Sequence, residues 1–307
     1  MATHRTTALA LVLSLAALLA MLAIPWNGES APVARVASGP GPSIAAWRRA
    51  GAAERSELLT AAAERGDPAG LELLAWVATF DLAGHELEVA RALLQLAPRA
   101  RSGDERKPLA DLCVLLETSD SACVQIASQA LSRARVEAAV PYWIELLSSA
   151  SRAVRERAQR SLEAVSGMAL GSGPERWLRW HESELAWFEL QAPRVLAELG
   201  DEDETKVLAA MREIAGRHLF RDELADALIV ALDRPESDVR ICACRTLAGL
   251  GSPLAVKPLV ALLEDENQAV RSAALSALRA LTGLELPLDA KAWNEALGIG
   301  MGVAGNA

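Results

Sequence analysis

One motif recurs along the chain and constrains the fold more than any other feature. With Cys123, Val154, Val239 and Val270 as position zero, each copy has leucine at position −7, alanine at +4 and leucine at +8. The residues at −7 are Leu116, Leu147, Leu232 and Leu263; those at +4 are Ala127, Ala158, Ala243 and Ala274; those at +8 are Leu131, Leu162, Leu247 and Leu278. Position zero recurs after 31 residues, from 123 to 154 and from 239 to 270. A fixed period of this kind predicts a stack of small repeated units.

The spacing within the motif predicts a helical hairpin. Positions zero, +4 and +8 share one face of a helix, and the small alanine allows a neighbouring helix to approach closely. The leucine at −7 belongs to a preceding helix. Capping residues lie two or three positions before position zero, where their side chains can accept the free N–H groups of the second helix. They are Asp120 and Ser121 in the first copy, then Ser151, Ser237 and Asn267.

Weaker copies extend the pattern. Thr205, with Lys206 and Ala209, forms a fainter fifth copy, and residues 71–97 are interpreted as a degenerate hairpin. A longer series recurs with every member shifted by 116 residues: Val154, Arg155, Ala158, Leu162, Gly167 and Trp177 become Val270, Arg271, Ala274, Leu278, Gly283 and Trp293. This echo predicts duplication of a larger block, with an atypical Trp-rich insertion near residues 168–192.

A hairpin of 31 residues, with Leu-Leu ending the first helix and V-R-x-x-A-x-x-x-L on the second, resembles the HEAT repeat. It is most similar to the short variety shared with phycobilisome lyase-type repeat proteins. The resemblance covers residues 109–283 and implies an all-α, right-handed α-solenoid of stacked, armadillo-like hairpins. Such proteins mostly bind other proteins, so the resemblance implies a protein partner. A lyase-like HEAT-repeat enzyme or enzyme accessory protein is the alternative.

Composition agrees with an all-α chain and disfavours one class of partner. The sequence is 51% hydrophobic but only 4% aromatic, and the abundant Ala, Leu, Glu and Arg are strong helix formers. The formal net charge is −9. Because binding to a phosphate backbone depends on an excess of Lys and Arg, we expect no nucleic-acid partner.

The first 24 residues are predicted to be a targeting segment. His4 and Arg5 precede a run without charges from Ala8 to Ile24. Its length leaves a cleaved signal peptide and a signal anchor both open, with residues 8–24 as the membrane tether in the second case. The positive charge lies before the run, so the rest of the chain should cross the membrane to the periplasm or stay anchored outside the cytoplasm. A flexible Pro/Gly/Ser-rich linker over 25–43, a solenoid over 44–297 and a disordered tail over 298–307 complete the predicted organisation.

No group of residues predicts catalysis. The four histidines, His4, His85, His181 and His218, are scattered singly, and no Cys or His spacing fits a metal site. No glycine-rich phosphate loop or nucleophile elbow is present. The protein is therefore expected to be no enzyme and to have no catalytic, cofactor-binding or metal-binding residues.

Three local groups admit a structural and a functional interpretation. Trp177, Trp180, Trp187 and Phe188 could form a stacking platform, but we favour core filling. The acidic run 201–204 could bind calcium, but its consecutive carboxylates are more typical of a helix start. The four cysteines, Cys113, Cys123, Cys242 and Cys244, are expected to be buried thiols rather than a disulfide framework.

A row of cations at position +1 is the one candidate binding site. Arg155, Lys206, Arg240 and Arg271 form this cation row. In the favoured interpretation each cation pairs with a carbonyl or carboxylate of an inter-helix turn, Asp238 and Asp265 being candidates, and so ties one repeat to the next. In the other, the row attracts an acidic segment of a partner protein.

Overall fold

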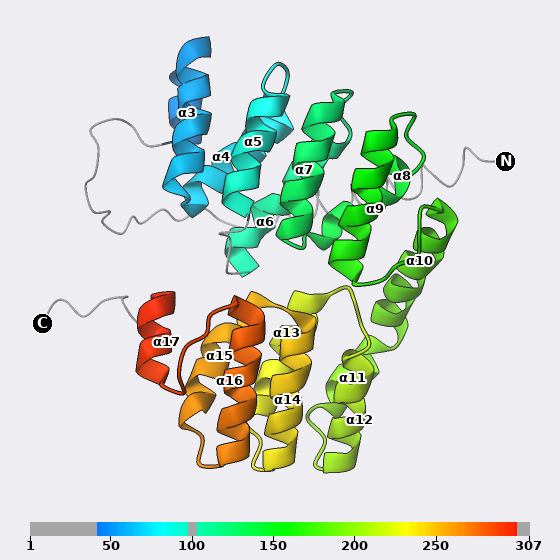
Figure 1. Ribbon diagram of the computed structural model, residues 1–307, viewed down its shortest axis with the longest axis vertical. Coiled ribbons are helices and arrows are strands. Elements are labelled where there is room, and N and C mark those ends of the chain that lie inside the picture. The colour runs from blue at the N-terminus through cyan, green and yellow to red at the C-terminus, as the bar shows by residue number, and fades with distance from the viewer. Residues whose placement is uncertain (1–41, 98–102, 300–307) are drawn as a thin grey trace, which may run out of the picture. The chain divides into compact units, whose positions relative to one another are not determined.

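The described part of the chain is entirely helical. The structure, a computed structural model, describes residues 42–97 and 103–299, and within these ranges it contains sixteen α-helices, five short 3-10 helices and no strand (Figure 1). None of the described helices combines the length and the hydropathy that crossing a membrane requires. The predicted targeting segment 1–24, all but the end of the linker and nearly all of the tail lie outside the described residues.

The first described helix, α2, begins at Ile44, the residue at which the repeat body was predicted to start, and the Ser43 side chain caps it. The α-helices are α2 (Ile44–Arg49), α3 (Ala52–Arg65), α4 (Pro68–Phe80), α5 (Glu86–Leu96), α6 (Gly103–Asp111), α7 (Ser121–Arg133), α8 (Val140–Leu146), α9 (Arg152–Ser166), α10 (Pro174–Leu190), α11 (Ala192–Glu198), α12 (Glu204–Ile214), α13 (Arg221–Ile229), α14 (Ser237–Leu250), α15 (Val256–Ala261), α16 (Gln268–Thr282) and α17 (Ala290–Leu297). The 3-10 helices are η2 (Leu112–Leu116), η3 (Glu137–Ala139), η4 (Val230–Asp233), η5 (Pro253–Ala255) and η6 (Leu262–Glu264).

The four clear sequence copies are helical hairpins, as predicted: α6/α7, α8/α9, α13/α14 and α15/α16. All residues at positions zero, +4 and +8 are buried, and so are the four leucines at −7. In three hairpins that leucine lies in the 3-10 turn that ends the first helix, namely η2, η4 or η6. The segment 71–97 is also a hairpin, α4/α5, which confirms its assignment as a degenerate copy.

In each hairpin, the helix that comes later in the chain is called the second helix. Second helices of consecutive hairpins pack side by side, α3 to α5 to α7 to α9 and then α12 to α14 to α16. Figure 1 shows the two rows, with the first helices behind them. The fold is therefore the predicted stack of hairpins, while its right-handed sense stays a prediction.

The predicted capping residues are confirmed in three of the four hairpins. Asp120, Ser151 and Asn267 each accept a hydrogen bond from a backbone N–H of the following helix. The assignment of Ser237 was wrong, because it is the first residue of α14 and the capping position belongs to Glu236, whose side chain makes no capping hydrogen bond.

The register predicted at Thr205 was also wrong. Thr205 and Ala209 are exposed, whereas Val207 and Met211 fill the core. The motif on α12 is therefore offset by two residues, with methionine where the other copies have alanine. Asp203 caps the helix. From that start the buried apolar side chains of α12 begin at Val207, two positions after the residue at which the motif was placed.

The helix α10 separates two hydrophobic cores. The first core contains residues between Trp47 and Trp177, together with Leu219, and the second runs from Trp187 to Trp293. Trp177 belongs to the first core and Trp187 to the second. The predicted Trp-rich insertion is thus a single helix that packs into both cores, and the core-filling interpretation of its tryptophans is confirmed.

Candidate functional site

Three members of the cation row bind the turn of their own hairpin in the same way. Each arginine donates from Nη1 to the two backbone carbonyls five and six residues before it. Arg155 reaches Ser149 O at 2.7 Å and Ala150 O at 3.0 Å; Arg240 reaches Arg234 O at 2.8 Å and Pro235 O at 2.9 Å; Arg271 reaches Asp265 O at 2.7 Å and Glu266 O at 3.0 Å. These carbonyls lie just beyond the first helix, where backbone acceptors lack intrahelical partners.

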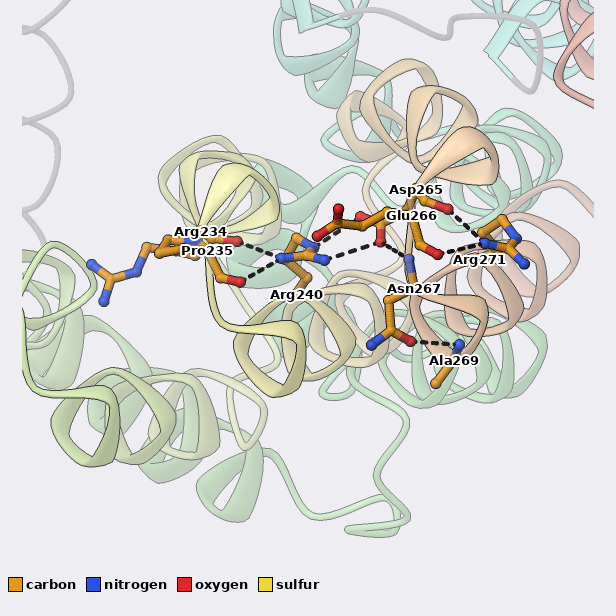
Figure 2. A network of polar contacts seen from close by, with 8 residues as sticks. All are labelled: Arg234, Pro235, Arg240, Asp265, Glu266, Asn267, Ala269 and Arg271. Carbon is orange, nitrogen blue, oxygen red and sulfur yellow. Dashed lines mark hydrogen bonds and ion pairs between the residues drawn. The ribbon is translucent and has the colours of Figure 1, made fainter.

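Arg240 also ties its hairpin to the next one (Figure 2). Its Nε and Nη2 donate to the two carboxylate oxygens of Asp265 at 2.8 Å and 3.0 Å, a bidentate pair that is almost fully buried. The hydrogen bonds that Arg240 donates to Asp265 raise the pKa of Arg240. Burial alone would raise the pKa of Asp265, but the hydrogen bonds from Arg240 and the Asn267 N–H lower it below its usual value. Of the two predicted carboxylates, Asp265 is the partner, and Asp238 lies in the first turn of α14.

Lys206 does not share this geometry. Its Nζ lies 2.8 Å from a carboxylate oxygen of Asp201, and both side chains are partly exposed. The offset register of α12 explains the difference. The acidic run 201–204 forms the helix start, as predicted, since Asp203 accepts a hydrogen bond from the Thr205 N–H. The structure therefore brings three of the four predicted residues into equivalent positions, and binding of a partner by the row stays a prediction.

Four of the second helices are basic. The helices α7, α9, α14 and α16 carry nine arginines and three acidic residues, a formal charge of +6, although the whole chain has −9. Within the described residues Arg133, Arg157, Arg160 and Arg245 take part in no ion pair or side-chain hydrogen bond. Sequence reasoning missed these four because it followed position +1. Summing charges helix by helix would have found them.

A groove of about 860 Å³ lies on the exposed side of α14 and α16. Most of its lining side chains are small: Ala248, Ala269, Ser272, Ala273, Ser276, Ala277 and Ala280, with Arg245, Asn267 and Gln268 at the same groove. Small side chains on two adjacent helices leave space in which another polypeptide can approach closely.

The predicted block duplication extends to individual hydrogen bonds. The indole of Trp177 donates to Gly171 O at 2.7 Å and that of Trp293 donates to Pro287 O at 3.0 Å. Donor and acceptor are both shifted by the 116 residues of the sequence echo. Trp177 and Trp293 are completely buried, so both blocks end in a tryptophan held by the preceding loop.

A polar network joins the two cores. The Glu137 carboxylate accepts hydrogen bonds from the backbone N–H groups of Phe220 and Arg221, and Arg221 donates to Val165 O. Phe220 has φ of +60°, an unusual conformation for a bulky residue. Burial raises the pKa of Glu137 to about 7, against the opposing effect of these hydrogen bonds.

The cysteines are free thiols. Cys113, Cys123 and Cys244 are buried, and Cys242 is half-buried. Burial raises the pKa of Cys113 and of Cys244 to about 12, so neither forms a reactive thiolate near neutral pH. In the described ranges no three His, Cys, Asp or Glu side chains gather in an arrangement that could hold a metal ion.

The comparison with protein families agrees with the repeat pattern. Residues 225–290 match the family model described as HEAT repeats, a stretch that runs from within α13 to the start of α17. No curated protein gives a significant match. The chain is similar to an engineered protein of known structure at 20% identity over 83% of this chain and 70% of that one, with a TM-score of 0.33. It is also similar to a designed armadillo repeat protein in complex with the peptide (KR)4, at 19% identity over 68% and 99%, with a TM-score of 0.28.

The class of protein follows from the hairpins and the family match. The described chain is an all-helical repeat protein, and residues 225–290 within it match HEAT repeats. The motif also recurs before residues 225–290, since α6/α7 and α8/α9 share it.

Proposed function

We propose that this protein is a non-catalytic scaffold that binds another protein through the exposed face of its second helices, in an extracytoplasmic compartment. The groove between α14 and α16 carries the proposal. It lies on two neighbouring repeats and combines small side chains with an unpaired cation, Arg245. Surfaces formed in this way by successive repeats are extended and suit a polypeptide rather than a small molecule.

The turn contacts support the same role. Arg155, Arg240 and Arg271 bind the ends of the first helices, and Arg240 joins two repeats. The turn hydrogen bonds fix each second helix against its own first helix, and the Arg240 pair fixes one repeat against the next, so a partner meets a preorganised surface and loses less free energy to ordering on binding.

The proposed compartment rests on residues 1–24. Fusion of a periplasm-dependent reporter enzyme after Ala307 tests it, and deletion of residues 1–24 provides the control. Reporter activity that depends on residues 1–24 is expected. The mass of the N-terminus of the exported protein would then distinguish a cleaved signal peptide from a signal anchor.

Site-specific photo-crosslinking tests the binding surface. A photoreactive phenylalanine derivative replaces Ser276 in the groove or, as a matched control, the exposed Ala261 on the first helix α15. We expect a discrete crosslinked protein from position 276 and none from 261 in cells that express the full chain. Equal crosslinking at both positions, or none at either, would contradict a scaffold that binds through its second helices.

A further inference from the structure

Three arginines on adjacent second helices form a basic patch, and none of the three has an ion-pair partner among the described residues. Arg133 ends α7, and Arg157 and Arg160 lie one turn apart on α9. The two helices pack against each other, and the Ser161 hydroxyl donates to Ser128 O between them. Arg133 and Arg160 are exposed. These three residues are named the α7/α9 patch.

Arg157 shows that this charge lacks a partner. Its side chain is partly buried, and its Nε has no hydrogen-bond partner and is shielded from water. Burial lowers its pKa, and so do the positive charges of Arg160 and Arg133. A partly buried cation without a counter-ion is costly, because desolvation is offset only when an opposite charge is close.

Nearby carboxylates are already engaged. Glu156 forms an ion pair with Arg152 at 2.7 Å, and Glu163 accepts a hydrogen bond from Gln159 at 2.8 Å. Two arginines of α14 and α16 differ, since Arg240 is paired with Asp265 and Arg279 lies 3.3 Å from Glu285. Because Gln159 is neutral, Glu163 keeps its negative charge, and Glu156 also attracts Arg160. Three arginines still outnumber these two carboxylates, so the α7/α9 patch has a net positive charge.

We propose that the α7/α9 patch binds an acidic segment of a partner protein. This inference rests on the proposed scaffold function and names the chemistry of the partner. Carboxylate side chains would supply the missing counter-charge and could accept bidentate hydrogen bonds from the guanidinium groups. Three arginines suit a short run of Asp or Glu. A nucleic acid fits less well, since the net charge of −9 repels a long phosphate backbone.

Fluorescence anisotropy with a defined probe tests the patch. The probe is a labelled decapeptide of alternating glutamate and glycine, titrated with the full chain, and the lysine-glycine peptide is the comparison. We expect the acidic peptide to bind, and the triple variant Arg133→Gln, Arg157→Gln, Arg160→Gln to bind it at least tenfold more weakly. Raising the salt concentration should weaken binding to the wild-type chain.

A second triple variant provides a control of equal charge. Arg65→Gln, Arg194→Gln and Lys291→Gln together also remove three positive charges, each from an exposed ion pair outside the patch. We expect binding within twofold of wild type. The double variant Arg133→Gln, Arg160→Gln changes exposed residues only, and its affinity for the acidic peptide should still fall several-fold. This variant keeps the partly buried Arg157, so its loss of affinity cannot come from misfolding at that residue.

Three results would overturn the inference. They are no binding of the acidic peptide to the wild-type chain, equal affinity of the patch variant and wild type, and tighter binding of a ten-nucleotide single-stranded DNA than of the peptide. None of these would affect crosslinking at position 276. If that crosslink persists while the acidic peptide does not bind, the scaffold proposal stands and the proposal of an acidic partner segment is wrong.

Discussion

At the residue scale, the small side chain at position +4 determines how closely two helices approach. Ala158 and Ala243 are completely buried. Replacing either by leucine should overpack its hairpin and lower the free energy of unfolding by about 1 to 3 kcal/mol. Urea denaturation measures the change, and Ala153→Leu, at an exposed position of α9, is the control. Unchanged midpoints at both buried positions would show that the motif has been placed in the wrong register.

The pair Arg240 and Asp265 is the second residue-scale test. Because both side chains are nearly buried, Arg240→Gln leaves a buried carboxylate without its partner and should cost about 3 kcal/mol. Arg152→Gln breaks an exposed pair and should cost less than about 1 kcal/mol. Thermal unfolding of the two variants compares them. Equal, small losses would mean that the Arg240 pair does not hold the repeats together.

The thiols give a third prediction at this scale. Burial of Cys113, Cys123 and Cys244 should protect them from iodoacetamide at pH 7, whereas the half-buried Cys242 is the first to react. Mass spectrometry of the native chain should find at most one modification, and the unfolded chain should show four. Loss of two mass units before labelling would instead reveal a disulfide.

At the element scale, the sequence predicted the hairpins well because the same positions are buried in every clear copy. The sequence prediction failed where a helix starts at a different position relative to the motif. The motif at Thr205 matched a cation and an alanine, but the apolar residues that fill the core begin at Val207. The cap at Ser237 failed for a related reason, since Ser237 lies one residue inside α14. Polar and small residues identify a register less reliably than buried side chains do.

Adjacent alanines on α12 test the corrected register. Ala210 is buried and Ala209 is exposed. Ala210→Leu should destabilise the chain by about 1 to 3 kcal/mol, whereas Ala209→Leu should change stability by less than about 0.5 kcal/mol. Denaturant midpoints decide between them. The opposite order would restore the register first predicted from the sequence.

At the scale of the whole molecule, the contacts between the two cores could not be read from the sequence. Glu137 and Phe220 are 83 residues apart, and no local pattern links a glutamate in a 3-10 turn to a backbone N–H in a distant loop. The excess of arginine on α7, α9, α14 and α16 is also a property of the assembled repeats. These arginines are spread over four helices, within a chain whose total charge has the opposite sign.

The core-to-core network predicts a pH dependence. The pKa of Glu137 is raised to about 7, so its contribution to stability is complete below its ordinary pKa of about 4.5 and is lost as the pH rises through 7. The free energy of unfolding should therefore fall by about 2 to 3 kcal/mol between pH 5 and pH 8 through this group. Glu137→Gln should remove that part of the slope, and exposed Glu202→Gln is the control. Identical slopes for Glu137→Gln and wild type would contradict the assignment.

Amide hydrogen exchange of the full chain, with and without the partner crosslinked at position 276, tests the central claim most directly. If the second helices form the binding surface, the partner should slow exchange in α14 and α16, and in α7 and α9 if it carries the acidic segment. The first helices α8, α13 and α15 should exchange as in the free chain. Protection confined to those first helices would contradict a scaffold that binds through its second helices.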